Sequence, residues 1–218
     1  MPPPLPLTVQ TEDGLTIEGY RWPATTPSFA TLIFFHGNAG NRYTAAAMAA
    51  PLRRPDAEII VASYRGYGDN PGRLSEAGLY RDGAAFLREA RLGKPDHLYL
   101  FGFSLGASVA LRLAADEPVD GVVTLGAFSS LARVAPRWVR PFLPDRFDNA
   151  AAVGRLRVPL LIFHGSGDET IPVAEAFTLK RAAASPLQVV ILQGAPHRIH
   201  LDPIALIIWE RLIQMARR

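Results

Sequence analysis

The apolar positions of this chain fall into short runs with two alternating spacings. Continuous or alternating apolar runs predict buried strands over residues 30–35, 58–63, 98–103, 121–125, 158–163 and 187–192. Runs in which apolar residues recur every three or four positions predict helices over residues 41–52, 75–91, 105–115, 173–184 and 203–215. Regular alternation of strands and helices is typical of an α/β fold, a mostly parallel, doubly wound sheet with helices on both faces.

Two features depart from this alternation. Residues 7–11 and 15–22 are short alternating runs joined at Asp13-Gly14, which predicts an N-terminal antiparallel hairpin at the sheet edge. Residues 129–155 mix aromatic residues with arginines and prolines, and we expect a short lid-like insertion there. A chain of 218 residues with this pattern predicts a single domain over residues 1–218.

The chemistry is most clearly indicated at Gly102-Phe103-Ser104-Leu105-Gly106, between a predicted strand and a predicted helix. A G-x-S-x-G sequence in this context is typical of a nucleophile elbow, a turn so sharp that the serine hydroxyl stands exposed at the sheet edge. The alternative is a glycine-lined turn whose serine only caps the helix. A serine is a weak nucleophile at neutral pH, so the elbow needs a base and a group that orients the base.

Candidate partners follow two later strands. Asp168 lies in a glycine-rich loop after the strand at 158–163, and His197 follows the strand at 187–192. Ligand sites of parallel sheets lie beyond the carboxyl ends of the strands, so we expect both side chains on the same rim as Ser104. Glu169 competes as the acid and His200 as the base, but each lies further from its strand end.

A reaction at Ser104 also needs hydrogen-bond donors for a developing oxyanion. We expect one from the backbone N–H of Leu105, at the start of a helix. The second is expected from Asn38, in the small-residue loop after the strand at 30–35. A phosphate-binding role for that loop is disfavoured because no Gly-Lys-Ser/Thr follows it.

The chain resembles the α/β-hydrolase superfamily, and within it small esterases and serine-aminopeptidase-like hydrolases. The resemblance rests on HGNAGN at 36–41, YRGYG at 64–68, GFSLG at 102–106, and HGSGD at 164–168 with IPV at 171–173. It implies Ser104 as nucleophile, His197 as base and Asp168 as its partner. Many relatives carry glycine before the histidine, where this chain has Pro196, and many carry a longer cap.

These residues predict a serine hydrolase that cleaves carboxylic or thio esters without a metal or cofactor. Alternatives are a peptidase or amidase on the same fold, or a binding module that lacks catalysis. We expect Tyr64, Trp138 and Phe142 to line the substrate pocket. A dinucleotide-binding domain is disfavoured because no G-x-G-x-x-G follows the first strands.

Composition and charge exclude several kinds of chemistry and of binding partner. The chain has no cysteine, which excludes disulfides and thiolate catalysis. The net charge is only +3, and no basic run with interleaved aromatic residues is present, so nucleic acid is not an expected partner. The arginines of residues 133–157 are more typical of a solvated loop than of an anion site. With no leader-like or membrane-length apolar segment, we expect a small-molecule ester substrate and a cytoplasmic location.

Overall fold

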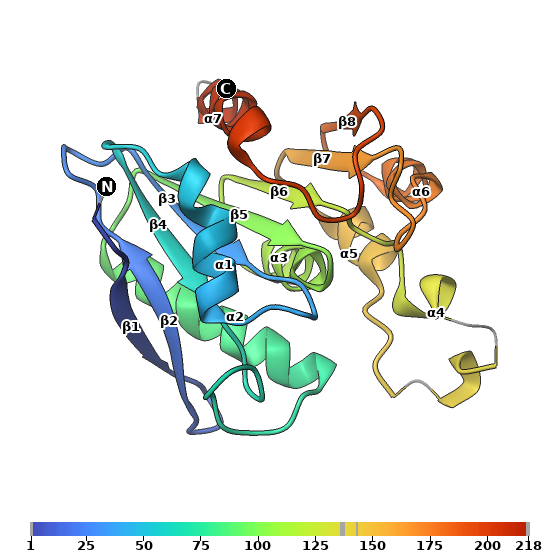
Figure 1. The fold of residues 1–218 in the computed structure, drawn as a ribbon, viewed down its shortest axis with the longest axis horizontal. Coiled ribbons are helices and arrows are strands. Elements are labelled where there is room, and N and C mark those ends of the chain that lie inside the picture. Colours follow the sequence, from blue (N-terminus) through green and yellow to red (C-terminus); the bar gives the residue numbers. More distant parts are fainter. Residues whose placement is uncertain (1, 136–137, 143, 217–218) are drawn as a thin grey trace.

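The computed structural model describes residues 2–135, 138–142 and 144–216, which contain one eight-stranded sheet in the order β1-β2-β4-β3-β5-β6-β7-β8 (Figure 1). The strands are β1 (Leu5–Gln10), β2 (Thr16–Trp22), β3 (Ala30–Phe35), β4 (Ala57–Ala62), β5 (His97–Phe103), β6 (Gly121–Leu125), β7 (Leu160–Gly165) and β8 (Leu187–Leu192). Strands β3 to β8 are parallel, whereas β1 and β2 form an antiparallel edge. The predicted fold class is confirmed.

Helices cover both faces of this sheet. They are α1 (Arg42–Ala49), α2 (Glu76–Leu92), α3 (Leu105–Asp116), α4 (Leu131–Val134), α5 (Asn149–Arg155), α6 (Ala174–Ala182) and α7 (Asp202–Ala216), with 3₁₀ turns η1 (Ala50–Leu52) and η2 (Arg140–Phe142). One apolar core packs α1 and α7 against the sheet, and a second packs α2, α3, α5 and α6 against the other face (Figure 1). Within the described ranges, no helix has the length and apolar character needed to cross a bilayer.

The two cores explain why the central strands read as continuous apolar runs. Neighbouring residues of a strand point to opposite faces, so Ile33 enters the core on the α2–α3 side while Phe34 enters the core on the α1–α7 side. Both side chains are fully buried. A parallel sheet covered on both faces therefore leaves its central strands without a polar side.

Local signals determine where several elements begin. Gly14 adopts a φ of 82° in the turn between β1 and β2, a conformation that glycine adopts without strain. Asn41 caps α1 by accepting hydrogen bonds from the backbone N–H groups of Tyr43 and Thr44. Ser75 caps α2 in the same way, accepting from Gly78. These residues are the ones that mark turns and helix starts in the sequence.

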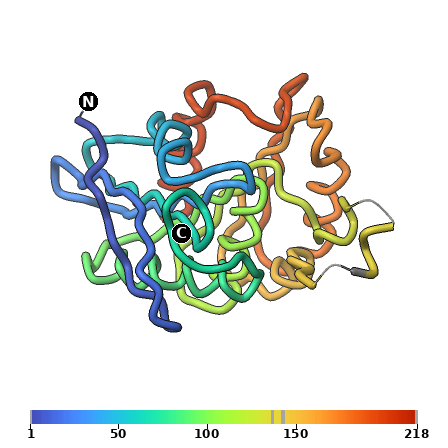
Figure 2. Tube along the Cα trace, turned by 60° about the horizontal axis from the view of Figure 1, so that its bottom comes forward, coloured from blue at the N-terminus to red at the C-terminus, as the bar shows by residue number. Residues whose placement is uncertain are grey.

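Residues 129–155 do not form one insertion. Helix α5 belongs to the body of the domain, because Asn149 is buried and its Nδ2 donates to Ser108 Oγ at 2.9 Å and to the Phe128 carbonyl at 2.8 Å. The stretch before it, which contains α4 and η2, extends to one side of the molecule (yellow in Figure 2). The expectation of a lid therefore applies only to the described residues before α5.

Candidate active site

The register of the parallel strands brings four chain segments to one edge of the sheet. Phe35 pairs with Gly102, so the loop after β3 lies beside the turn after β5. Leu125 at the end of β6 pairs with both Phe103 of β5 and Phe163 of β7. Gly165 at the end of β7 pairs with Leu192 at the end of β8, so the loops that carry the predicted site residues leave the sheet side by side.

Ser104 occupies a sharp turn between β5 and α3. Its φ is 52° and its ψ is −117°, a strained backbone conformation for a residue with a side chain. A Cβ at Gly102 would lie 2.4 Å from Ala107 Cα, and one at Gly106 would lie 2.1 Å from the Phe35 carbonyl oxygen. Only glycine fits at either position, and the turn leaves the Ser104 side chain partly exposed at the sheet edge.

The structure brings Ser104, His197 and Asp168 together in a line of hydrogen bonds. Ser104 Oγ lies 3.0 Å from His197 Nε2, and His197 Nδ1 lies 2.7 Å from Asp168 Oδ2. Since the carboxylate accepts a hydrogen bond, the proton of a neutral His197 ring resides on Nδ1. Nε2 is then an acceptor for the Ser104 hydroxyl proton.

The Asp168 carboxylate is buried and held by the loop that follows β7. Its Oδ1 accepts hydrogen bonds from the backbone N–H groups of Thr170 at 2.9 Å and Ile171 at 2.7 Å. A second imidazole lies near the other oxygen at a longer distance, with His164 Nε2 at 3.5 Å from Asp168 Oδ2 and at 2.9 Å from the Ile171 carbonyl that it contacts. Oδ2 is therefore left to face His197.

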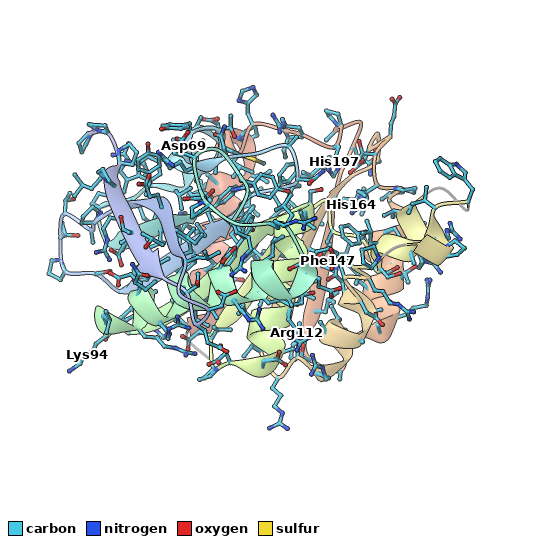
Figure 3. All side chains as sticks on the ribbon, turned by 90° about the horizontal axis from the view of Figure 1, so that it is seen from below. Asp69, Lys94, Arg112, Phe147, His164 and His197 are labelled. Carbon is cyan, nitrogen blue, oxygen red and sulfur yellow. The ribbon has the colours of Figure 1, made fainter. Side chains whose placement is uncertain are left out.

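The position of His197 depends on space left by glycines. Gly126, after β6, has a φ of 61°, and a Cβ there would lie 3.0 Å from His197 Cε1 and 3.1 Å from Nδ1. Gly165 passes so close to the loop before His197 that a Cβ would lie 2.1 Å from the Ala195 carbonyl oxygen. His197 and His164 lie near one another at this end of the sheet (Figure 3).

The loop after β3 covers Ser104 from the other side. A Cβ at Gly37 would lie 3.1 Å from Ser104 Cβ, so the backbone of this loop lies against the serine. Within the described chain, neither Asn38 nor Leu105 donates its backbone N–H to an acceptor. Tyr67 holds the Asn38 side chain, because its hydroxyl donates to Asn38 Oδ1 at 2.6 Å.

A cavity of about 280 Å³ opens beside Ser104, Asn38 and Leu105. Tyr67 contributes to its wall, but Tyr64 does not. The Tyr64 prediction is wrong because its side chain is fully buried under the loop, where its hydroxyl donates to the His36 carbonyl at 3.3 Å.

The two aromatic predictions in the lid segment have different outcomes. Trp138 is 78% exposed and is not among the described residues that border the cavity, so the structure does not place it in the pocket. Trp138 lies in an exposed stretch after α4, and its indole therefore faces solvent. The side chain of Phe142 lies outside the described residues.

Among the described hydrogen bonds, the Ser104 hydroxyl pairs with His197 and with neither the competing acid nor the competing base. Glu169 and His200 are exposed, and His200 borders a separate cavity of about 390 Å³ between α1 and the start of α7. Ser104 does not border that second cavity in the described structure. Among the residues described, no group of three or more histidine or acidic side chains is arranged to hold a metal ion.

A profile of the alpha/beta hydrolase fold family matches residues 30–154, more than half of the chain. The chain belongs to the alpha/beta hydrolase family. An uncharacterized protein of Mycobacterium tuberculosis is 32% identical over 95% of this chain and 80% of its own length. Human alpha/beta hydrolase domain-containing protein 17B is 31% identical over 77% of this chain and 60% of its own length.

Solved structures show the same alpha/beta hydrolase fold. The esterase domain of a Rhodothermus marinus protein covers 100% of this chain and 99% of that chain, with a TM-score of 0.75 and 21% identity. An α/β serine hydrolase without a lid from Xanthomonas campestris has a TM-score of 0.70 and 20% identity, and covers 100% of this chain and 96% of that chain.

Several residues of the site carry no sequence signal that singles them out. Gly126 follows β6 without a recognisable motif, although its lack of a Cβ leaves room for His197. His164 lies within a quoted motif, but only the fold places its ring against Asp168. Tyr67 and Tyr64 are three positions apart in one motif, and the sequence does not tell which of them faces the cavity.

Proposed function

We propose that this protein is a serine hydrolase that cleaves carboxylic or thio esters through an acyl-enzyme intermediate. The observation that carries the proposal is the line from Ser104 Oγ to His197 Nε2, at 3.0 Å, and from His197 Nδ1 to Asp168 Oδ2, at 2.7 Å. A hydroxyl, an imidazole and a carboxylate in this order are what nucleophilic catalysis by serine requires.

In the proposed first half-reaction, Ser104 Oγ attacks the carbonyl carbon while His197 Nε2 takes the hydroxyl proton. The bond to the leaving group then breaks, and the imidazolium returns the proton to the departing alcohol or thiol. In the second half-reaction, His197 takes a proton from water, and the water oxygen attacks the acyl carbon. The acid leaves and the Ser104 hydroxyl is restored. Asp168 stabilises the imidazolium throughout.

The developing oxyanion needs donors that are already in place. The N–H groups of Leu105 and Asn38 are proposed for this role because both residues border the cavity at Ser104. Leu105 is also the first residue of α3, where the helix dipole favours negative charge. The Tyr67 hydroxyl supports the second donor by holding the Asn38 side chain.

The test is turnover of p-nitrophenyl acyl esters by Ser104→Ala. Loss of the nucleophile of a triad commonly lowers the rate by about 10⁴- to 10⁶-fold, so purified variant is expected to be inactive with unchanged circular dichroism. Ser28→Ala is the matched control, because Ser28 lies before β3 at the opposite end of the sheet, where its hydroxyl donates to the Ala30 carbonyl. An unchanged rate for Ser104→Ala would exclude the assignment.

Two further assays on the same proteins separate ester hydrolysis from the two alternative functions. A binding module without catalysis would not react with a fluorophosphonate probe, whereas an activated Ser104 is labelled and Ser104→Ala is not. A peptidase or amidase would hydrolyse the matching p-nitroanilide at a rate comparable to the ester. We expect ester hydrolysis to dominate.

A further inference from the structure

The wall of the cavity at Ser104 is mostly apolar. The cavity lies between the start of α2, helix α4 and the residues just before α5. Apolar side chains dominate the wall: Leu79, Phe128, Leu131, Val134, Phe147 and Ile171. The charged side chain in the described wall is the carboxylate of Asp145, and no lysine or arginine is among the described wall residues. Such a wall favours an uncharged hydrocarbon and disfavours an anionic group.

The position of the site residues decides which half of an ester enters this cavity. Ser104, Leu105 and Asn38 border it, so a carbonyl carbon at Ser104 with its oxygen at the two N–H groups lies at its mouth. His197, which must protonate the leaving group, is not among the described residues that border it. The leaving group therefore departs on the His197 side, and the acyl chain enters the cavity.

Hydrogen bonds at both ends hold the outer wall in place. Asp145 Oδ1 accepts from the Glu76 backbone N–H at 2.9 Å, and Glu76 Oε2 accepts from the Arg146 backbone N–H at 2.8 Å. This exchange fastens the segment before α5 to the start of α2. The nearby rings of Tyr80 and Phe147 pack edge to face with centroids 6.0 Å apart.

The end of the wall next to α4 is fastened by Glu175 of α6. Its carboxylate accepts hydrogen bonds from the backbone N–H of Ser129 at 2.8 Å and from Arg133 Nε at 3.2 Å. Burial raises the pKa of Glu175, but the hydrogen bonds from Ser129 and Arg133 outweigh it and leave the pKa below its ordinary value. The charged carboxylate keeps α4 in place, so the cavity has a defined size.

We propose that the site selects uncharged acyl chains of about eight to ten carbons. This inference rests on the proposed ester hydrolysis. A methylene group takes up about the volume of a water molecule in the liquid, roughly 30 Å³. A cavity of about 280 Å³ therefore holds a chain of about nine such groups. Shorter chains leave apolar wall uncovered, and longer chains extend into solvent.

The experiment is a series of p-nitrophenyl esters with even acyl chains from C2 to C16, each below its critical micelle concentration. Burial of one methylene is worth about a fourfold gain in kcat/KM where the wall encloses it. We expect kcat/KM to rise from C2, to reach its maximum at C8 or C10, and to gain nothing at C12 and beyond. An ester whose chain ends in a carboxylate is expected to react at least tenfold more slowly than its uncharged equivalent.

Two variants of α4 test whether this wall sets the length. Val134→Trp reduces the cavity and is expected to move the maximum to chains at least two carbons shorter. Leu131→Ala enlarges it and is expected to move the maximum to chains about two carbons longer. Leu206→Trp is the matched control, because Leu206 is exposed on α7 and away from the cavity. If Val134→Trp does not fold, the result with Leu131→Ala decides whether this wall sets the preferred chain length.

The position of the maximum in the ester series, and its response to the α4 variants, decide between the two proposals. A maximum at C6 or shorter, or at C12 or longer, overturns the length assignment while ester hydrolysis stands. A maximum at C8 or C10 that neither α4 variant moves overturns the assignment of this cavity as the acyl site. Failure to hydrolyse any ester, together with failure to react with a fluorophosphonate, overturns both the proposed function and this inference.

Discussion

His36 provides a pH-dependent test of how the loop after β3 is held. Its side chain is buried, with Nδ1 at 2.8 Å from the Gly37 carbonyl and Nε2 at 3.3 Å from Ser63 Oγ. Its ring packs against Tyr64, with centroids 4.6 Å apart. Burial lowers the pKa of His36 from 6.5 to about 4, and the hydrogen bond to the Gly37 carbonyl offsets only part of the lost hydration.

This pKa determines how much, and in which direction, the stability of the folded protein changes with pH. Between pH 6.5 and about 4, the unfolded chain binds a proton at His36 that the folded protein does not. The contribution of the neutral His36 ring to the free energy of unfolding is therefore fully present above pH 6.5, and it is lost as the pH falls toward 4. One pKa unit corresponds to about 1.4 kcal/mol, so the full loss is about 3 kcal/mol.

The assay is urea unfolding of the wild type and of His36→Gln from pH 7.5 to pH 5. Glutamine keeps hydrogen-bonding atoms but has no proton to gain in this range. We expect the difference in unfolding free energy between the two proteins to shrink by about 2 kcal/mol over this interval. His200→Gln is the control at an exposed histidine, and its curve should follow that of the wild type. Parallel curves for wild type and His36→Gln would refute the buried neutral ring.

Two further substitutions, one of them with a matched control, test the geometry of the site. Gly126→Ala should lower ester kcat/KM by about 10²-fold because its Cβ displaces the His197 ring. Gly14→Ala shares the positive φ but meets no atom within 4 Å, so it should lose about 1 kcal/mol of stability and keep full activity. Equal activity losses would contradict the argument. Tyr67→Phe removes the hydrogen bond to Asn38 and should lower kcat about three- to tenfold with little change in KM; an unchanged kcat would show that the hydroxyl has no positioning role.

The element order and the main candidates were predictable because they depend on local pattern. The strands at 30–35, 121–125 and 187–192 have the predicted bounds, and most other elements differ by one or two residues. Gly102 and Gly106 indicated the turn at Ser104, since only glycine tolerates the close approaches found there. Loops after parallel strands meet at one edge, which is why Asp168 and His197 could be placed beside Ser104 in advance.

The pocket was not predictable in the same way. Tyr64 and Tyr67 belong to one motif, yet Tyr64 is fully buried and Tyr67 borders the cavity. Which ring faces the cavity depends on how the loop after β4 folds back over His36, and this involves packing between distant segments. Trp138 has the composition of a pocket residue, but its segment extends away from the sheet and leaves it exposed.

The sequence by itself determined the fold class, the order of the elements and the residue types available for chemistry, because periodicity and turn residues act over a few positions. Tertiary structure alone decided the contacts: the space that Gly126 leaves for His197, the attachment of α4 to Glu175, and the volume enclosed beside Ser104. These quantities arise where segments far apart in the chain pack against one another, and no local pattern specifies the distance between them.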